Sequence, residues 1–261
     1  MKSSKQEVII IAGANGSGKT TFAKELLRSF AYSYLNADEI AKKLNVDDLT
    51  KVRISAGKEF LNQLSKLITK RKNIIIESTL SGQYLVRLID KLKDKGYIVT
   101  IFFILVDTPQ ECIHRIKQRV LKGEHSVPKN DVIRRFYRGR ANFWTKYRFL
   151  VDFWYLIDNS GYNFEDIALG IKDNYEVINT KLYKIFIRDA FNKNKKSLSK
   201  ISKLKLLELY KRATIFLRIG NEAVHYAQEK NRKLGIPNVY GMNGKVFFEM
   251  PNGTIVTKSP W

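Results

Sequence analysis

Two hydrophobic patterns alternate along the first two thirds of the chain. Short apolar runs, typical of buried strands, lie in residues 7–12, 32–38, 72–80, 96–107 and 149–158. Between them, apolar residues recur every three or four positions, which is typical of helices, in residues 21–30, 48–71, 81–95, 109–122 and 131–147. Because strands and helices alternate, the pattern predicts an α/β fold with a parallel sheet flanked by helices on both faces.

The remainder of the chain is organised differently. Residues 192–203 are polar and lysine-rich, which is typical of a linker. Helical spacing then extends from Leu204 to Gly235, where glycine is expected to end the helix. Two Asn-Gly pairs, at 243–244 and 252–253, predict tight turns between short alternating runs. We expect a small α+β module, a helix and a three-stranded meander, that packs on the first domain or on another copy because it is too small to fold alone. The predicted divisions are 1–191, 192–203 and 204–261.

The first apolar run leads directly into GANGSGKT, a match to the phosphate-loop pattern Gly-x4-Gly-Lys-Thr. Glycines allow the backbone to approach a phosphate closely, so that successive N–H groups surround it and the following helix adds its positive end. We expect Lys19 to reach the β- and γ-phosphates and the Thr20 hydroxyl to bind Mg²⁺. The sequence therefore predicts a site for ATP or GTP formed by Gly13, Ala14, Asn15, Gly16, Ser17, Gly18, Lys19, Thr20 and Thr21.

Acidic residues end three of the later apolar runs. Asp38, Glu77 and Asp107 are placed on the same edge of the sheet as the glycine loop, because ligands of parallel sheets bind beyond the carboxyl ends of the strands. Asp107, before Thr-Pro-Gln-Glu, is equally typical of a helix cap. For Asp38 and Glu77 a functional role is favoured.

A small-molecule kinase needs a phosphate loop, a carboxylate to accept the acceptor's proton, and mobile arginines over the transferred phosphoryl. The base-reading and switch motifs of GTPases are not found in register, and Glu77 has polar neighbours unlike those of motor or transporter ATPases. Asp38 is the candidate base. Arg115 and Arg119 share one helix face, and the polar segment 122–130 is typical of a lid loop. The candidate arginines are Arg115, Arg119, Arg134, Arg135, Arg138 and Arg140.

Several segments, in order, resemble the zeta-toxin family of P-loop kinases: GANGSGKTTF, LNADEIA, IIIESTLSG, TPQECIHRIKQRV, GEHSVPKNDVIRRFYR and YLIDNSG. The resemblance covers about residues 7–190. The best-known members of that family phosphorylate the 3′-hydroxyl of UDP-N-acetylglucosamine and thereby poison cell-wall synthesis. The resemblance therefore implies a toxin-like kinase that acts on a metabolite hydroxyl and is restrained by an antitoxin.

The same resemblance implies roles for individual residues. Asp38 would be the acceptor base, Arg119 a phosphoryl clamp, and Glu77 and Thr79 substrate contacts, while the loop lysine and threonine keep their roles. In these roles Asp38, Lys19 and Arg119 form the catalytic set.

The chain also departs from the family at two places. Asn36-Ala37-Asp38 stands where the best-known members have Asp-Gly-Asp, and His125 stands where they have a second lid arginine. We expect Arg134 or Arg135 to bind the nucleotide phosphates as the second clamp, and His125 to contact the substrate. These departures leave the identity of the acceptor open.

Composition widens the range of partners. The chain has 47 Lys and Arg against 25 Asp and Glu, a net charge of +22. Such a charge suits polyanions, although most of these side chains are expected on solvated faces. The single cysteine, Cys112, excludes an intramolecular disulfide and favours a reducing, cytoplasmic compartment. We expect no membrane span and no signal peptide, because the apolar runs are short, and no zinc site, because no His and Cys cluster has ligand spacing.

The sequence thus predicts a P-loop kinase that transfers the γ-phosphoryl of ATP or GTP, with Mg²⁺, to an alcohol group of a small molecule. The charge keeps two alternatives open: a polynucleotide or RNA kinase, and an NTP-dependent nucleic-acid-binding regulator. Residues 204–261 resemble small stand-alone bacterial proteins carrying NRxLGIPNVY and NGK. They are either a structural or oligomerising addition or a built-in inhibitor.

Overall fold

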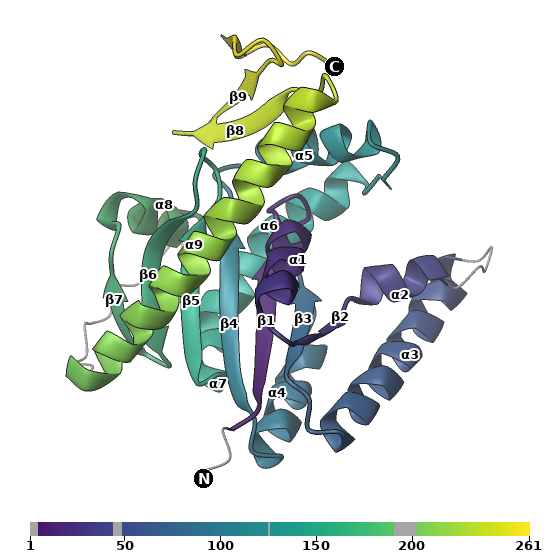
Figure 1. Ribbon diagram of the computed structural model, residues 1–261, viewed down its shortest axis with the longest axis vertical. Coiled ribbons are helices and arrows are strands. Elements are labelled where there is room, and N and C mark those ends of the chain that lie inside the picture. Colours follow the sequence, from purple (N-terminus) through teal and green to yellow (C-terminus); the bar gives the residue numbers. More distant parts are fainter. Residues whose placement is uncertain (1–4, 44–48, 125, 191–202) are drawn as a thin grey trace.

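The protein consists of one large sheet covered by helices and a small second sheet at its C-terminal end (Figure 1). The computed structural model describes residues 5–43, 49–124, 126–190 and 203–261. The predicted linker, apart from its last residue, and the predicted substrate contact His125 lie outside the described residues.

The large sheet has the strand order β2-β3-β1-β4-β5-β6-β7. The first five of these strands are mutually parallel, as the alternating pattern predicts. The last two strands, β6 and β7, were not predicted; each pairs antiparallel with the strand before it. Antiparallel neighbours can be joined by a short connection, whereas parallel neighbours need a long crossover. The bounds are β1 (Glu7–Gly13), β2 (Ser33–Leu35), β3 (Ile74–Ser78), β4 (Ile98–Leu105), β5 (Phe153–Asp158), β6 (Glu165–Ile171) and β7 (Asn174–Val177).

The helices lie close to their predicted positions. The predicted helix 131–147 is one continuous run of α6, a π-helical turn and α7, and the short α2 after β2 and α8 after β7 were not predicted. Among the helices of the described residues, none is long and apolar enough to cross a membrane. The bounds are α1 (Lys19–Ser29), α2 (Ala37–Lys43), α3 (Leu49–Thr69), α4 (Tyr84–Asp94), α5 (Pro109–Val120), α6 (Lys129–Asn142), η1 (Phe143–Tyr147), α7 (Arg148–Leu150), α8 (Thr180–Ala190) and α9 (Lys203–Lys233).

Each face of the sheet has its own apolar core. On one face, side chains of α3, α4, η1 and α8 pack on alternate residues of the strands. The opposite face carries α1 and the long α9, which run beside each other (Figure 1). Phe216 of α9 packs against Phe102 of β4, with ring centroids 4.4 Å apart and the ring planes at 49° to each other. The predicted C-terminal helix is therefore part of the main hydrophobic core.

The small sheet, β8 (Asn238–Met242), β9 (Lys245–Glu249) and β10 (Ile255–Val256), is the predicted three-stranded meander. Asn243 and Gly244 both have positive φ, as the tight turn between β8 and β9 requires. The sheet packs against α5: the Arg115 Nε donates to the Val239 carbonyl (3.1 Å), and the Gln118 Nε2 donates to the Pro237 carbonyl (2.5 Å). This contact joins the end of the chain to the helix that carries two of the candidate arginines.

Candidate nucleotide and phosphoryl-transfer site

The glycine loop connects the end of β1 to the start of α1, as the sequence predicts. Gly18 caps α1 in a left-handed conformation (φ 97°), and Gly16 has φ 84°. A Cβ added to Gly16 would lie 2.7 Å from the Cys112 carbonyl, and one on Gly18 would lie 2.4 Å from the Asn159 amide nitrogen. Neighbouring segments thus enclose the loop so closely that glycine is needed at both positions.

Lys19 lies within this loop. Its side chain is buried, and Nζ donates to the Ala14 carbonyl at 2.7 Å, across the loop. Burial lowers the pKa of Lys19, the negative charges of Glu77 and Asp38 raise it, and the positive charge of Arg119 lowers it. All three predicted partners are thus near enough to act electrostatically on this ammonium group.

Thr20 and Glu77 meet directly. The Thr20 hydroxyl donates to the Glu77 carboxylate at 3.0 Å, because β3 pairs with β1 in a register that places Glu77 beside Ile11. Glu77 is buried, which raises its pKa, whereas the Lys19 charge and hydrogen bonds from Tyr34 and Thr20 lower it. A hydroxyl beside a carboxylate is an oxygen donor set suited to Mg²⁺.

Asp38 lies in the first turn of α2, directly after β2, and its side chain is exposed. Its backbone N–H donates to the Asn36 side-chain oxygen at 2.8 Å. Thr79, beyond the end of β3, shares a hydrogen bond of 2.8 Å with Ser81, and its carbonyl lies against Gly139 of α6. Asp38, Glu77 and Thr79 therefore all lie at the edge of the sheet that carries the glycine loop.

The predicted arginine clamps have distinct surroundings. Arg119 pairs with Glu124 through Nε (2.9 Å) and Nη2 (2.6 Å) and is about one third exposed. Arg134 is exposed and pairs with Asp131 at 2.8 Å. Arg135 donates to the Asn15 side-chain oxygen at 3.2 Å. Of the two candidates for the second clamp, Arg135 is the one hydrogen-bonded to the loop.

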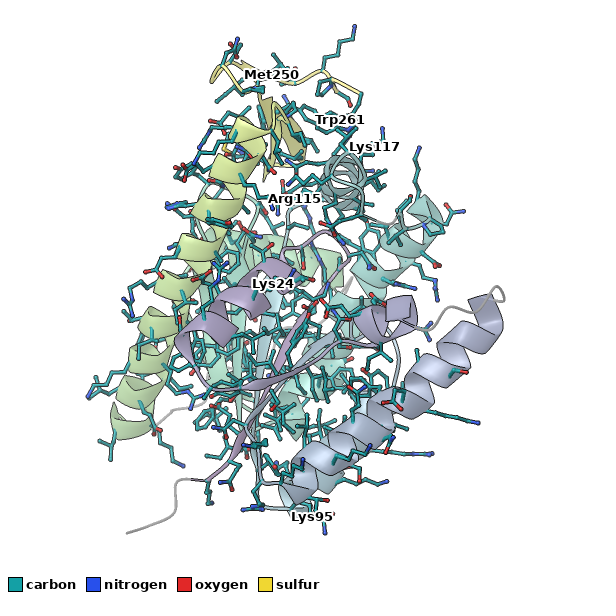
Figure 2. The ribbon with its side chains drawn as sticks, turned by 45° about the vertical axis from the view of Figure 1, so that its right-hand side comes forward. Lys24, Lys95, Arg115, Lys117, Met250 and Trp261 are labelled. Atoms are coloured by element: carbon teal, nitrogen blue, oxygen red, sulfur yellow. The ribbon has the colours of Figure 1, made fainter. Side chains whose placement is uncertain are left out.

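The structure separates Arg115 from this group, although Arg115 and Arg119 were expected to act from one face of α5. Arg115 pairs with buried Glu111 at 2.8 Å and donates to carbonyls of the small sheet and of Ser160. Figure 2 places it below the C-terminal sheet. The Arg115 guanidinium is therefore bonded to the C-terminal sheet, which covers this part of α5.

Asp107 is not the cap of α5, which was one of its two expected roles. Thr108 caps α5 by accepting from the Glu111 N–H at 3.1 Å. Asp107 instead accepts from the Gly244 N–H at 2.6 Å and so fastens the β8–β9 turn. Sequence patterns do not signal this contact, since the partners are far apart in the chain.

Asn159 is a site residue that the sequence reasoning missed. It follows β5, and its amide donates to the Ser17 carbonyl of the loop at 2.8 Å. Its position after a strand leading to the same edge was the available signal in YLIDNSG.

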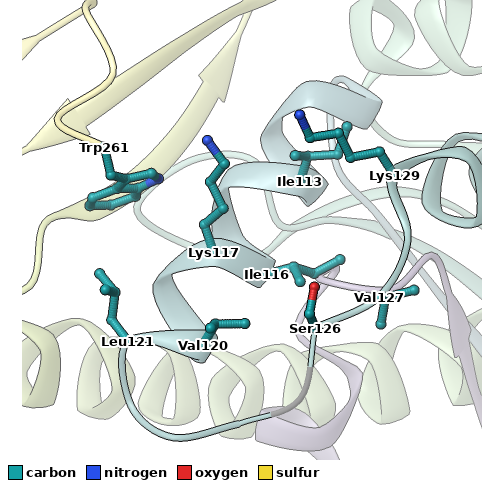
Figure 3. Close-up of a pocket in the computed structure, with 9 residues that line it drawn as sticks. All are labelled: Ile113, Ile116, Lys117, Val120, Leu121, Ser126, Val127, Lys129 and Trp261. Carbon is teal, nitrogen blue, oxygen red and sulfur yellow. The ribbon is translucent and has the colours of Figure 1, made fainter.

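A separate cavity of about 430 Å³ lies between α5, residues 126–129 and Trp261 (Figure 3). Its walls are mainly apolar, from Ile113, Ile116 and Val120 among others, with Lys117 and Lys129 at its margin. No residue of the glycine loop lines it, so it is distinct from the predicted nucleotide site.

Comparison with known proteins supports this fold. The chain matches the AAA_33 family, described as an AAA domain, over residues 8–141. It is 36% identical over 84 residues to a cytidylate kinase of Saccharolobus islandicus, a match covering 29% of this chain and 44% of that enzyme.

Two solved structures share the fold over most of the chain. One is from the PezAT toxin–antitoxin system of Streptococcus pneumoniae (TM-score 0.53, 20% identity, 83% of this chain and 89% of that one). The other is from the AvrRxo1-ORF1:-ORF2 complex with ATP (TM-score 0.59, 16% identity, 86% of this chain and 77% of that one). A phosphate loop on a mainly parallel sheet, together with a match over just over half of its length, places this chain in the AAA_33 family of AAA domains.

Proposed function

We propose that the protein is a nucleotide-dependent kinase that transfers the γ-phosphoryl group of ATP or GTP to an alcohol group of a small molecule. One observation carries this proposal: an exposed carboxylate, Asp38, lies beside a phosphate loop whose Lys19 is buried and whose Thr20 contacts Glu77. This combination suits transfer to a second substrate. The structure of the AvrRxo1 complex with ATP and the similarity to a cytidylate kinase support it.

In the proposed reaction, the acceptor oxygen forms a bond to the γ-phosphorus while the bond from that phosphorus to the β–γ bridging oxygen breaks. Asp38 takes the acceptor proton, and the nucleoside diphosphate leaves. Lys19 binds the β- and γ-phosphates, and Arg119 and Arg135 approach the transferred group from α5 and α6. Thr20 would hold Mg²⁺, with Glu77 hydrogen-bonded to the Thr20 hydroxyl. Bound Mg²⁺ would neutralise part of the phosphate charge.

For the acceptor we propose a sugar nucleotide of the UDP-N-acetylglucosamine type, phosphorylated in the cytoplasm, with toxic consequences that require restraint. The resemblance to zeta toxins motivates this choice. The fold shared with a chain of a toxin–antitoxin system supports an antitoxin partner. The alternative source of restraint is the chain's own C-terminal region, which contacts α5 and the segment after β5.

The test is incubation of the full chain with γ-labelled ATP or GTP, Mg²⁺ and a bacterial metabolite extract, followed by mass spectrometry of the labelled products. A labelled small molecule that depends on both Lys19 and Asp38 is expected. Label that appears only on RNA ends would favour the polynucleotide kinase instead. The absence of any Mg²⁺-dependent nucleotide binding would refute the proposal.

A further inference from the structure

A continuous set of hydrogen bonds joins the phosphate loop to the start of α2. The Thr20 hydroxyl donates to one oxygen of Glu77, and the Tyr34 hydroxyl donates to the other. The Asn36 side-chain nitrogen donates to the Tyr34 oxygen at 2.9 Å, and the Asn36 side-chain oxygen accepts from the Asp38 N–H at 2.8 Å. Thus Tyr34 and Asn36 physically connect the Thr20–Glu77 pair to the backbone of the proposed base.

Strand register explains why these groups meet. β2 lies beside β3, with Tyr34 opposite Ile75 and Leu35 opposite Ile76, so Asn36 emerges next to Glu77. Side chains two positions apart in a strand share a face, which places Tyr34 and Asn36 on the same face as Glu77. That face is the one covered by α1, whose first turn contains Thr20.

We propose that Tyr34 and Asn36 are positioning residues that orient Glu77 beside Thr20 and set the place of Asp38 at the start of α2. This inference rests on the proposed kinase function. Neither residue touches a reacting atom; Tyr34 acts through Glu77, and Asn36 acts through the backbone of Asp38.

The chemistry of the two side chains suits these roles. Burial and the charge of Glu77 raise the pKa of Tyr34, so its hydroxyl keeps its proton and remains a donor throughout the working range. Asn36 is buried and offers both a donor and an acceptor, which an aspartate does not. Its oxygen also accepts from the Glu39 N–H at 3.4 Å, as expected of a helix N-cap.

The chain offers a control tyrosine directly before the same strand. The Tyr32 hydroxyl donates to the Glu7 carboxylate at 2.8 Å, near the opposite end of the sheet. Tyr34→Phe and Tyr32→Phe therefore each remove one tyrosine–glutamate hydrogen bond, and Tyr34→Phe also removes the bond that Asn36 donates to the Tyr34 oxygen. Only the first bond belongs to the proposed site.

The experiment compares these two variants of the full chain, using γ-labelled ATP, Mg²⁺ and a bacterial metabolite extract. For Tyr34→Phe, we expect kcat to fall about 10- to 100-fold, the worth of a hydrogen bond to a charged group, with a smaller change in KM for ATP. Tyr32→Phe should change neither quantity.

Asn36→Ser separates capping from positioning. Serine still caps α2 but has no amide donor for Tyr34, so thermal stability should be largely kept while kcat falls. Calorimetry of ATP binding with and without Mg²⁺ provides a readout independent of turnover, and Tyr34→Phe should reduce the gain in affinity that Mg²⁺ gives.

These measurements test the positioning roles and the kinase function separately. If the wild-type protein transfers phosphate, equal kcat values and equal Mg²⁺-dependent gains in ATP affinity for Tyr34→Phe and Tyr32→Phe would overturn the positioning roles alone. A wild-type protein that binds neither ATP nor GTP in the presence of Mg²⁺ would overturn the kinase function itself.

Discussion

Removal of the C-terminal region is expected to unfold the protein and not to release a restrained enzyme. The perturbation is truncation after Asn194, which deletes α9 and the small sheet. In the described chain, α9 covers one face of the large sheet beside α1. An inhibitory segment that dissociates as a unit would instead leave a folded kinase domain behind.

The loss of stability on truncation can be worked out from the buried side chains of α9. Leu209, Phe216, Ile219 and Val224 are between 0% and 8% exposed. Burying such a side chain stabilises by about 1.5–3 kcal/mol, so their loss removes roughly 6–12 kcal/mol. This is comparable to the whole stability of a typical domain, about 5–15 kcal/mol. The ion pair between Arg212 and Glu7 of β1 is lost as well.

The assay compares soluble yield, thermal unfolding, phosphoryl transfer and colony growth for three chains: the full protein, the truncation after Asn194, and one ending at Gly235. The first truncation should be insoluble and harmless, and the second should retain the main core because it keeps α9. The reasoning is refuted if the chain ending at Asn194 is soluble, more active and toxic. Rescue of such toxicity by residues 195–261 supplied separately would establish the built-in inhibitor.

Other predictions address the site and its surroundings. Lys19→Ala should abolish transfer and weaken triphosphate binding more than diphosphate binding, measured by calorimetry. Asp38→Asn should keep nucleotide binding and lower kcat by about 10²–10⁴; unchanged turnover would remove Asp38 from the mechanism. Burial raises the pKa of Asp158 to about 6 from 3.8, so its contribution to stability is present below pH 3.8 and is lost as pH rises through 6. The free energy of unfolding in urea should therefore fall by up to about 3 kcal/mol over this pH range, and Asp158→Asn should remove this fall. Binding to single-stranded RNA should be weak at physiological salt, whereas tight binding with a steep salt dependence would favour the nucleic-acid alternatives.

Features that depend on local sequence were predictable. The glycine loop, the parallel strands and the Asn243-Gly244 turn each result from a few adjacent residues with restricted backbone conformations. The β6–β7 hairpin escaped prediction because its short strands, EDIALGI and NYEV, have no strong turn signal between them. The same reasoning placed Asp38 and Glu77 at the correct edge, since strand ends define that edge.

Features that depend on distant partners were not predictable. The helical spacing of Arg115 and Arg119 puts them on one face, but spacing cannot tell that the end of the chain occupies Arg115. Likewise, the spacing of α9 reveals an apolar stripe without revealing which surface the stripe covers. The assignment of the helix to a separable module followed from the polar run before it, whereas its burial follows from complementarity with α1 and the sheet.

Asn36 illustrates how a departure from a family pattern gains meaning from structure. In the sequence, Asn36-Ala37-Asp38 differs from Asp-Gly-Asp and only puts the acceptor in doubt. In the structure, the Asn36 amide donates to Tyr34, which a carboxylate could not do, and its oxygen caps α2. Asn36 and Tyr34 therefore depend on each other, and we expect a substitution at one of these positions to require a substitution at the other. An aspartate at position 36 would face the Tyr34 oxygen with no proton to donate, and it would compete with Glu77 for the tyrosine hydroxyl.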